Sequence, residues 1–215
     1  MEINVNRYLE LLIKENEKQN LVSRKAGREE LIGHVEDSLK LLDFYKIKDK
    51  KVIDIGSGAG FPALLLAIYC PDAMFTLVES DLKKSNFLIQ AVGELGLKNV
   101  RVLRERAEIL GQNPLYRAHY DICTSRAVAA LNVLLEYGLP LLELEGRLFL
   151  WKGKNYAAEI AQAEQALTVF KARVEDVCLY SLLEEKDRAI VVVKKEAPTP
   201  QKYPRRVGIP AKRPI

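Results

Sequence analysis

The pattern of apolar and polar positions divides the chain into a helical beginning and a longer alternating part. Apolar residues recur three or four positions apart over residues 2–22 and again from residue 29 to about residue 44, with charged residues between them. This spacing predicts two amphipathic helices, each with one apolar face. A polar, basic segment at residues 20–27 separates them. We therefore expect residues 1–46 to form an N-terminal helical extension.

From residue 47 to residue 195, short apolar runs alternate with longer stretches of helical spacing. The predicted strands are 52–55, 75–78, 100–103, 120–124, 147–151, 174–180 and 189–194, and the predicted helices are 61–70, 82–95, 107–110, 127–142 and 155–169. Buried strands that alternate with helices are typical of a parallel α/β sheet. Residues 181–188 are too few for a crossover helix, so the last two strands should form an antiparallel hairpin. The prediction is a seven-stranded, mostly parallel sheet with one antiparallel strand.

The C-terminal residues 196–215 differ from the rest of the chain in charge and in proline content. The 215-residue chain carries a formal net charge of +4, and residues 201–215 alone contribute +5, so the remainder carries −1. This end of the chain also holds five of the nine prolines. We expect an extended, basic tail on an almost neutral domain, and such a basic region favours an acidic partner.

The composition excludes several classes of protein. Apolar residues make up 48% and charged residues 29%, which suits a folded domain and is wrong for a disordered chain. We find no apolar stretch long enough to cross a membrane and no secretory signal, so we expect a cytoplasmic protein. The three cysteines lie more than 50 residues apart, which favours reduced thiols over a metal site. Nothing in the sequence demands more than a monomer.

The segment from Asp54 to Pro62 is the most informative motif, because it follows a predicted strand and opens a helix. Glycines at such a turn permit positive φ and close approach of a ligand to the backbone. In the dinucleotide fingerprint G-x-G-x-x-G, the third glycine is the fifth residue after the first, whereas here Gly60 is the fourth residue after Gly56 and Phe61 is the fifth. The acid-x-G-x-G-x-G pattern, with Gly58 at its centre, resembles the adenosylmethionine loop of class I methyltransferases. An NAD-dependent oxidoreductase and a turn without a ligand are the weaker alternatives.

Four later residues fit the same nucleotide-binding architecture. Glu79 ends the second predicted strand, where a carboxylate can accept hydrogen bonds from both hydroxyls of a ribose. Ala107 and Glu108 follow the third strand, where this architecture meets the adenine ring, although an acid there also suits the first turn of a helix. Arg126 follows the fourth strand, at the sheet edge that lines the ligand crevice. Because a cation is unfavourable at a helix start, ligand binding is the better explanation for Arg126.

Missing motifs narrow the class of methyl acceptor. The Asn/Asp-Pro-Pro-aromatic loop that commonly serves amine methylation is absent, because that place holds Thr124-Ser125-Arg126-Ala127. Carbon-5 methylation of a pyrimidine needs a nucleophilic cysteine, and Cys123 falls inside a strand as a small core residue. The remaining acceptors have a free lone pair and no proton to lose. Nitrogen N7 of guanine is such an acceptor, and its methylation needs alignment rather than a general base.

Several segments together resemble one family, the ribosomal small subunit methyltransferase G family, from about residue 20 to the C-terminus. The glycine loop alone is shared by many methyltransferases, whereas the combination is specific. The matching segments are Asn20-Leu21-Val22-Ser23, His34-Val35-Glu36-Asp37-Ser38-Leu39, Asp54 to Pro62, Ser125-Arg126-Ala127-Val128-Ala129, Lys152-Gly153 and Tyr203-Pro204-Arg205-Arg206 with Gly208-Ile209-Pro210. Ala63 and Glu79 stand where the family often has glycine and aspartate, and both preserve the chemistry.

The resemblance implies an enzyme that methylates N7 of a guanine in 16S rRNA of the small ribosomal subunit. It implies S-adenosylmethionine as the cofactor, held by Gly56, Phe61, Ala107, Glu108 and Arg126, to which the loop and strand-end arguments add Gly58, Gly60 and Glu79. The alternatives are a methyltransferase that acts on a small molecule or a protein, and a non-catalytic RNA-binding protein that retains a cofactor pocket. No residue stands out as a general base.

Basic side chains near the predicted crevice are candidates for neutralising RNA phosphates, which makes binding salt-dependent. They lie between the first two helices, after the fifth strand and in the tail: Arg24, Lys25, Arg28, Lys152, Lys154, Arg205 and Arg206. Each is equally compatible with an ordinary solvated charge. His34 and Asp37 form either an active-site pair or a buried pair that docks their helix on the sheet. Trp151 either stacks on a base or fills the end of the sheet.

Overall fold

The computed structural model describes residues 1–23, 26–182 and 186–215. Seven strands form one sheet in the order β3-β2-β1-β4-β5-β7-β6. Their bounds are β1 Lys51–Ile55, β2 Met74–Val78, β3 Val100–Leu103, β4 Tyr120–Arg126, β5 Leu142–Lys152, β6 Ala172–Leu182 and β7 Lys186–Lys195. Strands β1 to β5 pair in parallel, whereas β7 is antiparallel to both β5 and β6. The predicted sheet and its terminal hairpin are therefore confirmed.

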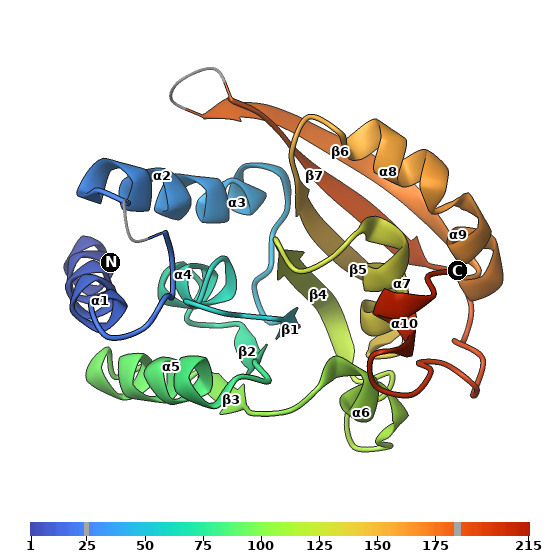
Figure 1. The fold of residues 1–215 in the computed structure, drawn as a ribbon, viewed down its shortest axis with the longest axis horizontal. Coiled ribbons are helices and arrows are strands. Elements are labelled where there is room, and N and C mark those ends of the chain that lie inside the picture. Colours follow the sequence, from blue (N-terminus) through green and yellow to red (C-terminus); the bar gives the residue numbers. More distant parts are fainter. Residues whose placement is uncertain (24–25, 183–185) are drawn as a thin grey trace.

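Helices cover both faces of the sheet (Figure 1). Their bounds are α1 Glu2–Asn16, α2 Arg28–Leu39, α3 Leu41–Phe44, α4 Ala63–Tyr69, α5 Leu82–Glu94, α6 Ala107–Gln112, α7 Leu131–Gly138, α8 Tyr156–Gln162, α9 Glu164–Phe170 and α10 Ile209–Lys212. One core lies under α1, α2, α4 and α5, and the other under α6, α7 and α9. Successive residues of a strand point to opposite faces, so Val52 enters the first core and Ile53 the second.

Several predicted boundaries were wrong for local reasons. The first helix ends at Asn16 rather than at residue 22, because the Asn16 side chain accepts hydrogen bonds from the backbone N–H groups of Leu21 and Val22 at 2.8 and 3.0 Å. The chain turns there instead of continuing the helix. The helix predicted at 127–142 is only α7, because Ala127 has φ +57° and β5 already begins at residue 142. The helix predicted at 155–169 is divided at residue 163.

The C-terminal segment is folded, so the prediction of an extended tail was wrong. It packs beside α6 and α7 (Figure 1), and Tyr203 is buried with its ring centroid 4.9 Å from that of Phe170. Arg117 donates hydrogen bonds to the backbone carbonyls of Thr199 and Tyr203 at 2.8 and 2.7 Å. The prolines therefore lie in a segment whose carbonyl groups are bound by the body of the protein.

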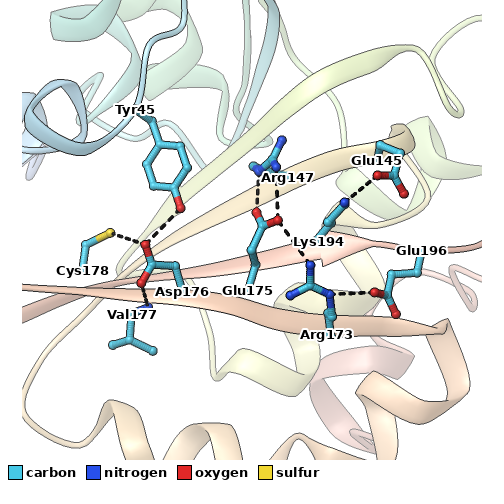
Figure 2. A network of polar contacts seen from close by, with 10 residues as sticks. All are labelled: Tyr45, Glu145, Arg147, Arg173, Glu175, Asp176, Val177, Cys178, Lys194 and Glu196. Carbon is cyan, nitrogen blue, oxygen red and sulfur yellow. Dashed lines mark hydrogen bonds and ion pairs between the residues drawn. The ribbon is translucent and has the colours of Figure 1, made fainter.

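A ladder of charged side chains crosses β5, β6 and β7 (Figure 2). Arg147 on β5 donates to Glu175 on β6 at 2.5 Å, and Arg173 pairs with Glu196 at 2.7 Å. Such exposed pairs contribute about 0–1 kcal/mol each, so their weight in overall stability is small. Because β6 is an edge strand, its charges discourage pairing with a second sheet edge.

A buried cation at the end of β7 makes stability depend on pH. The Lys195 ammonium donates to the backbone carbonyls of Leu139 and Leu142 at 2.8 and 2.5 Å, and burial lowers its pKa from 10.5 to about 8. Between these values the unfolded chain binds more protons, so the free energy of unfolding should rise with pH, by up to about 1.4 kcal/mol per pH unit. Urea unfolding at pH 8.0 and 9.5 should show this rise. The Lys195→Met variant should lack it, and an equal rise in both proteins would contradict the assignment.

Candidate active site

The glycine loop is fixed to the end of β2. The N–H groups of Gly56 and Ser57 donate to the Val78 carbonyl at 2.9 and 3.0 Å, and Gly56 has φ +69°. A Cβ atom on Gly56 would lie 2.5 Å from Cγ2 of Val128, in the loop after β4. Gly60, with φ +107°, is limited in the same way by Leu64, whose Cβ would lie 3.0 Å away. Conformation and packing together therefore require glycine at both positions.

Gly58 differs, because it faces open space. A Cβ atom there would meet only a backbone oxygen at 3.8 Å, although its φ of +54° still favours glycine. Its N–H donates to Oε2 of Glu79 at 2.9 Å, and Oε1 of Glu79 accepts from the N–H of Asp81 at 2.8 Å. The Glu79 carboxylate therefore lies next to the accessible backbone of Gly58. Each Glu79 oxygen keeps a second lone pair, and its binding of ribose hydroxyls stays a prediction.

A buried acid lies at the base of the same loop. Thr124 donates to Oδ1 of Asp54 at 2.6 Å, while Oδ2 has no hydrogen-bond partner among the described residues. Burial raises the pKa of Asp54 to about 7, although the hydrogen bond from Thr124 lowers it. A buried acceptor without a donor is costly, and a donor from a bound ligand would remove that cost. The loop therefore combines the accessible backbone of Gly58 with the Oδ2 atom of Asp54, which is unpaired within the described part of the chain.

Arg126 ends β4 and contacts the loop from the other side. Its guanidinium lies 4.8 Å from the ring centroid of Phe61, and its Nη1 atom donates to Oδ2 of Asp37 at 2.7 Å. Both members of this ion pair are largely buried, with side chains 13% and 8% exposed. The His34 ring lies on the same phenyl ring, at 5.4 Å between centroids. Arg126 is thus held in one position between α2 and the loop.

Asp37 and Trp151 join α2 to the sheet. Tyr180 on β6 donates to Oδ1 of Asp37 at 2.6 Å, and the Trp151 indole donates to the Asp37 carbonyl at 2.8 Å. Trp151 is only 5% exposed. The geometry supports a structural role for both residues. Asp37 docks its helix on the sheet, and its partners are Arg126 and Tyr180 rather than His34. Trp151 fills the end of the sheet.

Glu108 faces the C-terminal segment. Its carboxylate accepts hydrogen bonds from the Gly208 N–H at 2.9 Å and from Arg106 at 3.1 Å, and it is 2% exposed. Burial raises its pKa, but these hydrogen bonds outweigh that effect and hold the pKa below its ordinary value. The carboxylate is therefore occupied, and contact of Ala107 and Glu108 with a cofactor stays a prediction for their backbone.

The predicted RNA contacts separate into occupied and available cations. Lys152 is buried and donates to Glu159 at 2.6 Å and to the Ala129 carbonyl at 2.9 Å. Arg205 forms a bidentate ion pair with the buried Glu136. The structure argues against phosphate binding by these two side chains, because each already neutralises an acid. The exposed members of the set are Arg28, Lys154 and Arg206. Of these, Arg28 donates a hydrogen bond to Asn6. Arg24 and Lys25 lie outside the described residues.

The two tail arginines provide a matched pair of variants. Arg205→Gln should lower the free energy of unfolding by about 3 kcal/mol, because it leaves the Glu136 carboxylate buried without its cation. Arg206→Gln should leave stability within about 0.5 kcal/mol and instead weaken rRNA binding, with a smaller dependence on salt. Urea unfolding and filter binding at several salt concentrations measure both quantities. Equal loss of stability in the two variants would contradict this division.

A hollow of about 450 Å³ opens where β4 and β5 end, and we call it the sheet-end hollow. The side chains that matter to its chemistry are His34, Asp37, Arg126, Trp151, Lys152 and Arg188. In an open α/β sheet, ligands bind outside the carboxyl ends of the strands, which is where this hollow lies. Arg126 and its partners Asp37 and Phe61 connect it to the glycine loop.

The fold is that of an adenosylmethionine-dependent methyltransferase. A solved methyltransferase of this kind from Aquifex aeolicus matches with a TM-score of 0.56 at 20% identity, over 73% of this chain and 89% of that one. TYW2 of M. jannaschii in complex with AdoMet matches with a TM-score of 0.60 at 12% identity, over 80% and 79% of the two chains. Similarity at this level of identity establishes the fold alone.

Sequence comparison establishes the family. The family model described as GidB, rRNA small subunit methyltransferase G, matches residues 1–191. Proteins named ribosomal RNA small subunit methyltransferase G are similar over nearly the whole chain: that of Syntrophomonas wolfei is 58% identical over all of both chains, and that of Chloroflexus aggregans is 44% identical over 97% of this chain and 88% of its own. The chain belongs to the rRNA small subunit methyltransferase G family, as its motifs predicted.

Sequence reasoning missed several residues that build the site. Tyr8 on α1 is fully buried, donates to the Ala59 carbonyl at 2.7 Å and packs edge-on against Phe61. Glu159 on α8 binds Lys152 and the Leu131 N–H, and thereby fixes α8 and α7 to the end of β5. Both lie in ordinary helical patterns, which carry no signal for these distant partners. Within the described ranges we find no cluster of ligands suited to a metal and no helix long and apolar enough to span a membrane.

Proposed function

We propose that this chain transfers the methyl group of S-adenosylmethionine to N7 of a guanine in the 16S rRNA of the small ribosomal subunit. The observation that carries the proposal is the sheet-end hollow, which lies beside the glycine loop of a chain that belongs to an rRNA methyltransferase family. The rRNA of a ribosomal particle also places the reaction in the cytoplasm. A nearly neutral domain with exposed cations such as Arg206 and Lys154 suits such a partner.

The cofactor site is proposed at the glycine loop. The uncovered backbone at Gly58 admits close approach of a ligand, and the adjacent Glu79 carboxylate accepts hydrogen bonds from ribose hydroxyls. Gly56, Gly60 and Phe61 maintain the loop conformation. When bound, S-adenosylmethionine supplies an electrophilic methyl group on a sulfonium.

The acceptor guanine is proposed to occupy the sheet-end hollow, in a flipped or unpaired state. Its N7 ring lone pair would face the methyl group that a cofactor held at Gly58 and Glu79 would supply, with the cofactor's sulfur as the leaving group. No proton leaves N7, so the protein supplies alignment and a polar surrounding. Arg126, fixed by Asp37 and Phe61, positions the junction between loop and hollow.

The titratable groups of the hollow agree with a reaction that needs no base. Burial lowers the pKa of His34, and the neighbouring Arg126 lowers it further, so the imidazole is a weakened base. The carboxylates of Asp37 and Glu159 are already occupied by Arg126 and Lys152. Neither acid is therefore available as a proton acceptor, in keeping with N7 as the acceptor.

A transfer assay tests the proposed function. Purified protein is incubated with methyl-labelled S-adenosylmethionine and small ribosomal subunits from cells that lack the modification, and the RNA and protein fractions are then separated. We expect the label in the RNA fraction. Label in the protein fraction or in small molecules would favour the alternative methyltransferases, and calorimetric silence with S-adenosylmethionine would favour a non-catalytic RNA-binding protein.

A further inference from the structure

The β6–β7 hairpin extends beyond the carboxyl end of β5. The last pair between β5 and β7 joins Lys152 to Ala189, whereas pairing between β6 and β7 continues through Arg188, Asp187 and Lys186. Past the end of β5, no third strand of the described residues lies beside this two-stranded ribbon. A second hollow, of about 370 Å³, lies between the ribbon and the start of α8, and we call it the hairpin hollow.

The hairpin hollow combines cations with apolar and aromatic surface. Its lining includes Lys154, Tyr156, Leu179, Asp187 and Arg188. Leu179 is 59% exposed, and neither Lys154 nor Arg188 is ion-paired with an acid of the described residues. A site that offers cations and a ring together suits a nucleotide, because phosphate binds the cations and a base stacks on the ring.

Arg188 connects this hollow to the sheet-end hollow, since it lines both. Its Nη1 atom would lie 3.5 Å from a Cβ atom built on Gly153, so the guanidinium reaches from β7 across the end of β5. Lys152 and Glu159 fix the adjoining chain, because their ion pair joins β5 to α8. Arg188, which lines both hollows, therefore lies beside anchored elements.

We propose that the hairpin hollow binds the nucleotide next to the methylated guanine in single-stranded rRNA. Arg188 binds the phosphate that joins the two nucleotides, Lys154 adds a second positive charge, and the neighbouring base lies against Tyr156 and Leu179. Asp187, which also lines the hollow, repels phosphate and thereby confines it to the Arg188 side. This inference rests on the proposed function, because it places the target guanine in the sheet-end hollow.

Three variants and a matched control test the inference. Arg188→Gln and Tyr156→Ala should each raise KM for small ribosomal subunits about tenfold, with the affinity for S-adenosylmethionine unchanged within about twofold, and Tyr156→Ala should also leave kcat unchanged within about twofold. Arg188→Gln should also reduce the salt dependence of RNA binding by about 0.7 in the log–log slope, the value for one phosphate contact to a single strand. Tyr156→Phe should keep the wild-type KM, since phenylalanine also stacks. Lys98→Gln removes an exposed charge before β3, at the opposite edge of the sheet, and should change nothing.

The outcomes separate this inference from the function on which it rests. If the wild-type chain methylates rRNA while Arg188→Gln and Tyr156→Ala keep KM within twofold, the hairpin hollow is not a nucleotide site and the proposed function stands. An equal loss of cofactor affinity in these variants would also overturn the inference, because it would assign them a structural role. If the wild-type chain leaves rRNA unmethylated, both proposals fail. Thermal unfolding of every variant checks that the fold is retained.

Discussion

Replacing Gly58 with aspartate is expected to weaken binding of S-adenosylmethionine by at least about 100-fold and to leave the fold intact. The new carboxylate would enter the open space in front of the loop, next to Glu79, whose Oε2 atom accepts from the Gly58 N–H at 2.9 Å. The side chain would occupy the space through which a ligand approaches the Gly58 backbone, and a 100-fold loss of affinity corresponds to about 2.8 kcal/mol. Isothermal titration calorimetry measures the affinity directly.

The cost of this substitution to stability is small because of the local geometry. A Cβ atom at position 58 meets only a backbone oxygen at 3.8 Å, and a left-handed aspartate costs about 1 kcal/mol. Gly58→Asn is the matched control, because it fills the same space without the charge and should weaken binding to a similar extent. Affinity within threefold of wild type for the aspartate variant would contradict the placement of the cofactor at this loop.

Replacing Arg126 with methionine is expected to lower the free energy of unfolding by about 3 kcal/mol. The variant leaves the Asp37 carboxylate buried without its cation, and breaking one side of a buried ion pair is costly. Methionine keeps apolar contact with Phe61, so the lost charge dominates the effect. Urea unfolding of the variant and of wild type provides the measurement.

A second substitution separates charge from packing in this cluster. Asp37→Asn added to Arg126→Met removes the unpaired carboxylate and should recover at least about 1 kcal/mol, because the amide oxygen can still accept from Tyr180. The double variant should then fold well enough for assay, with methyl transfer still impaired at the altered hollow. A loss below about 1 kcal/mol for Arg126→Met alone would contradict the buried pair.

The sheet was predictable because its signal is local and repeated. Runs such as Phe75–Val78 and Val100–Leu103 are short, apolar and separated by helical stretches, so the order of elements follows from the sequence. The glycine spacing at Gly56, Gly58 and Gly60 likewise reports a backbone conformation, and the structure gives all three positive φ. The family followed from motifs that the sequence displays directly.

Pairings between distant residues were not predictable. Arg205 and Lys152 look like free basic residues in the sequence, and only the fold places Glu136 and Glu159 against them. The tail was expected to be extended because of its prolines, but no local pattern shows that Arg117 binds its carbonyl groups. A sequence thus indicates where charge lies, whereas the tertiary contacts decide which charges remain available to a partner.

Identifying the atom that receives the methyl group distinguishes N7 of guanine from every other acceptor. Small ribosomal subunits that lack the modification are incubated with the protein and labelled S-adenosylmethionine, and the extracted 16S rRNA is digested to nucleosides for chromatography and mass spectrometry. We expect the label to comigrate with 7-methylguanosine and the labelled position to become sensitive to reduction and chain cleavage, as expected of a positively charged guanine ring. Label on another base, or on another atom of guanine, would contradict it.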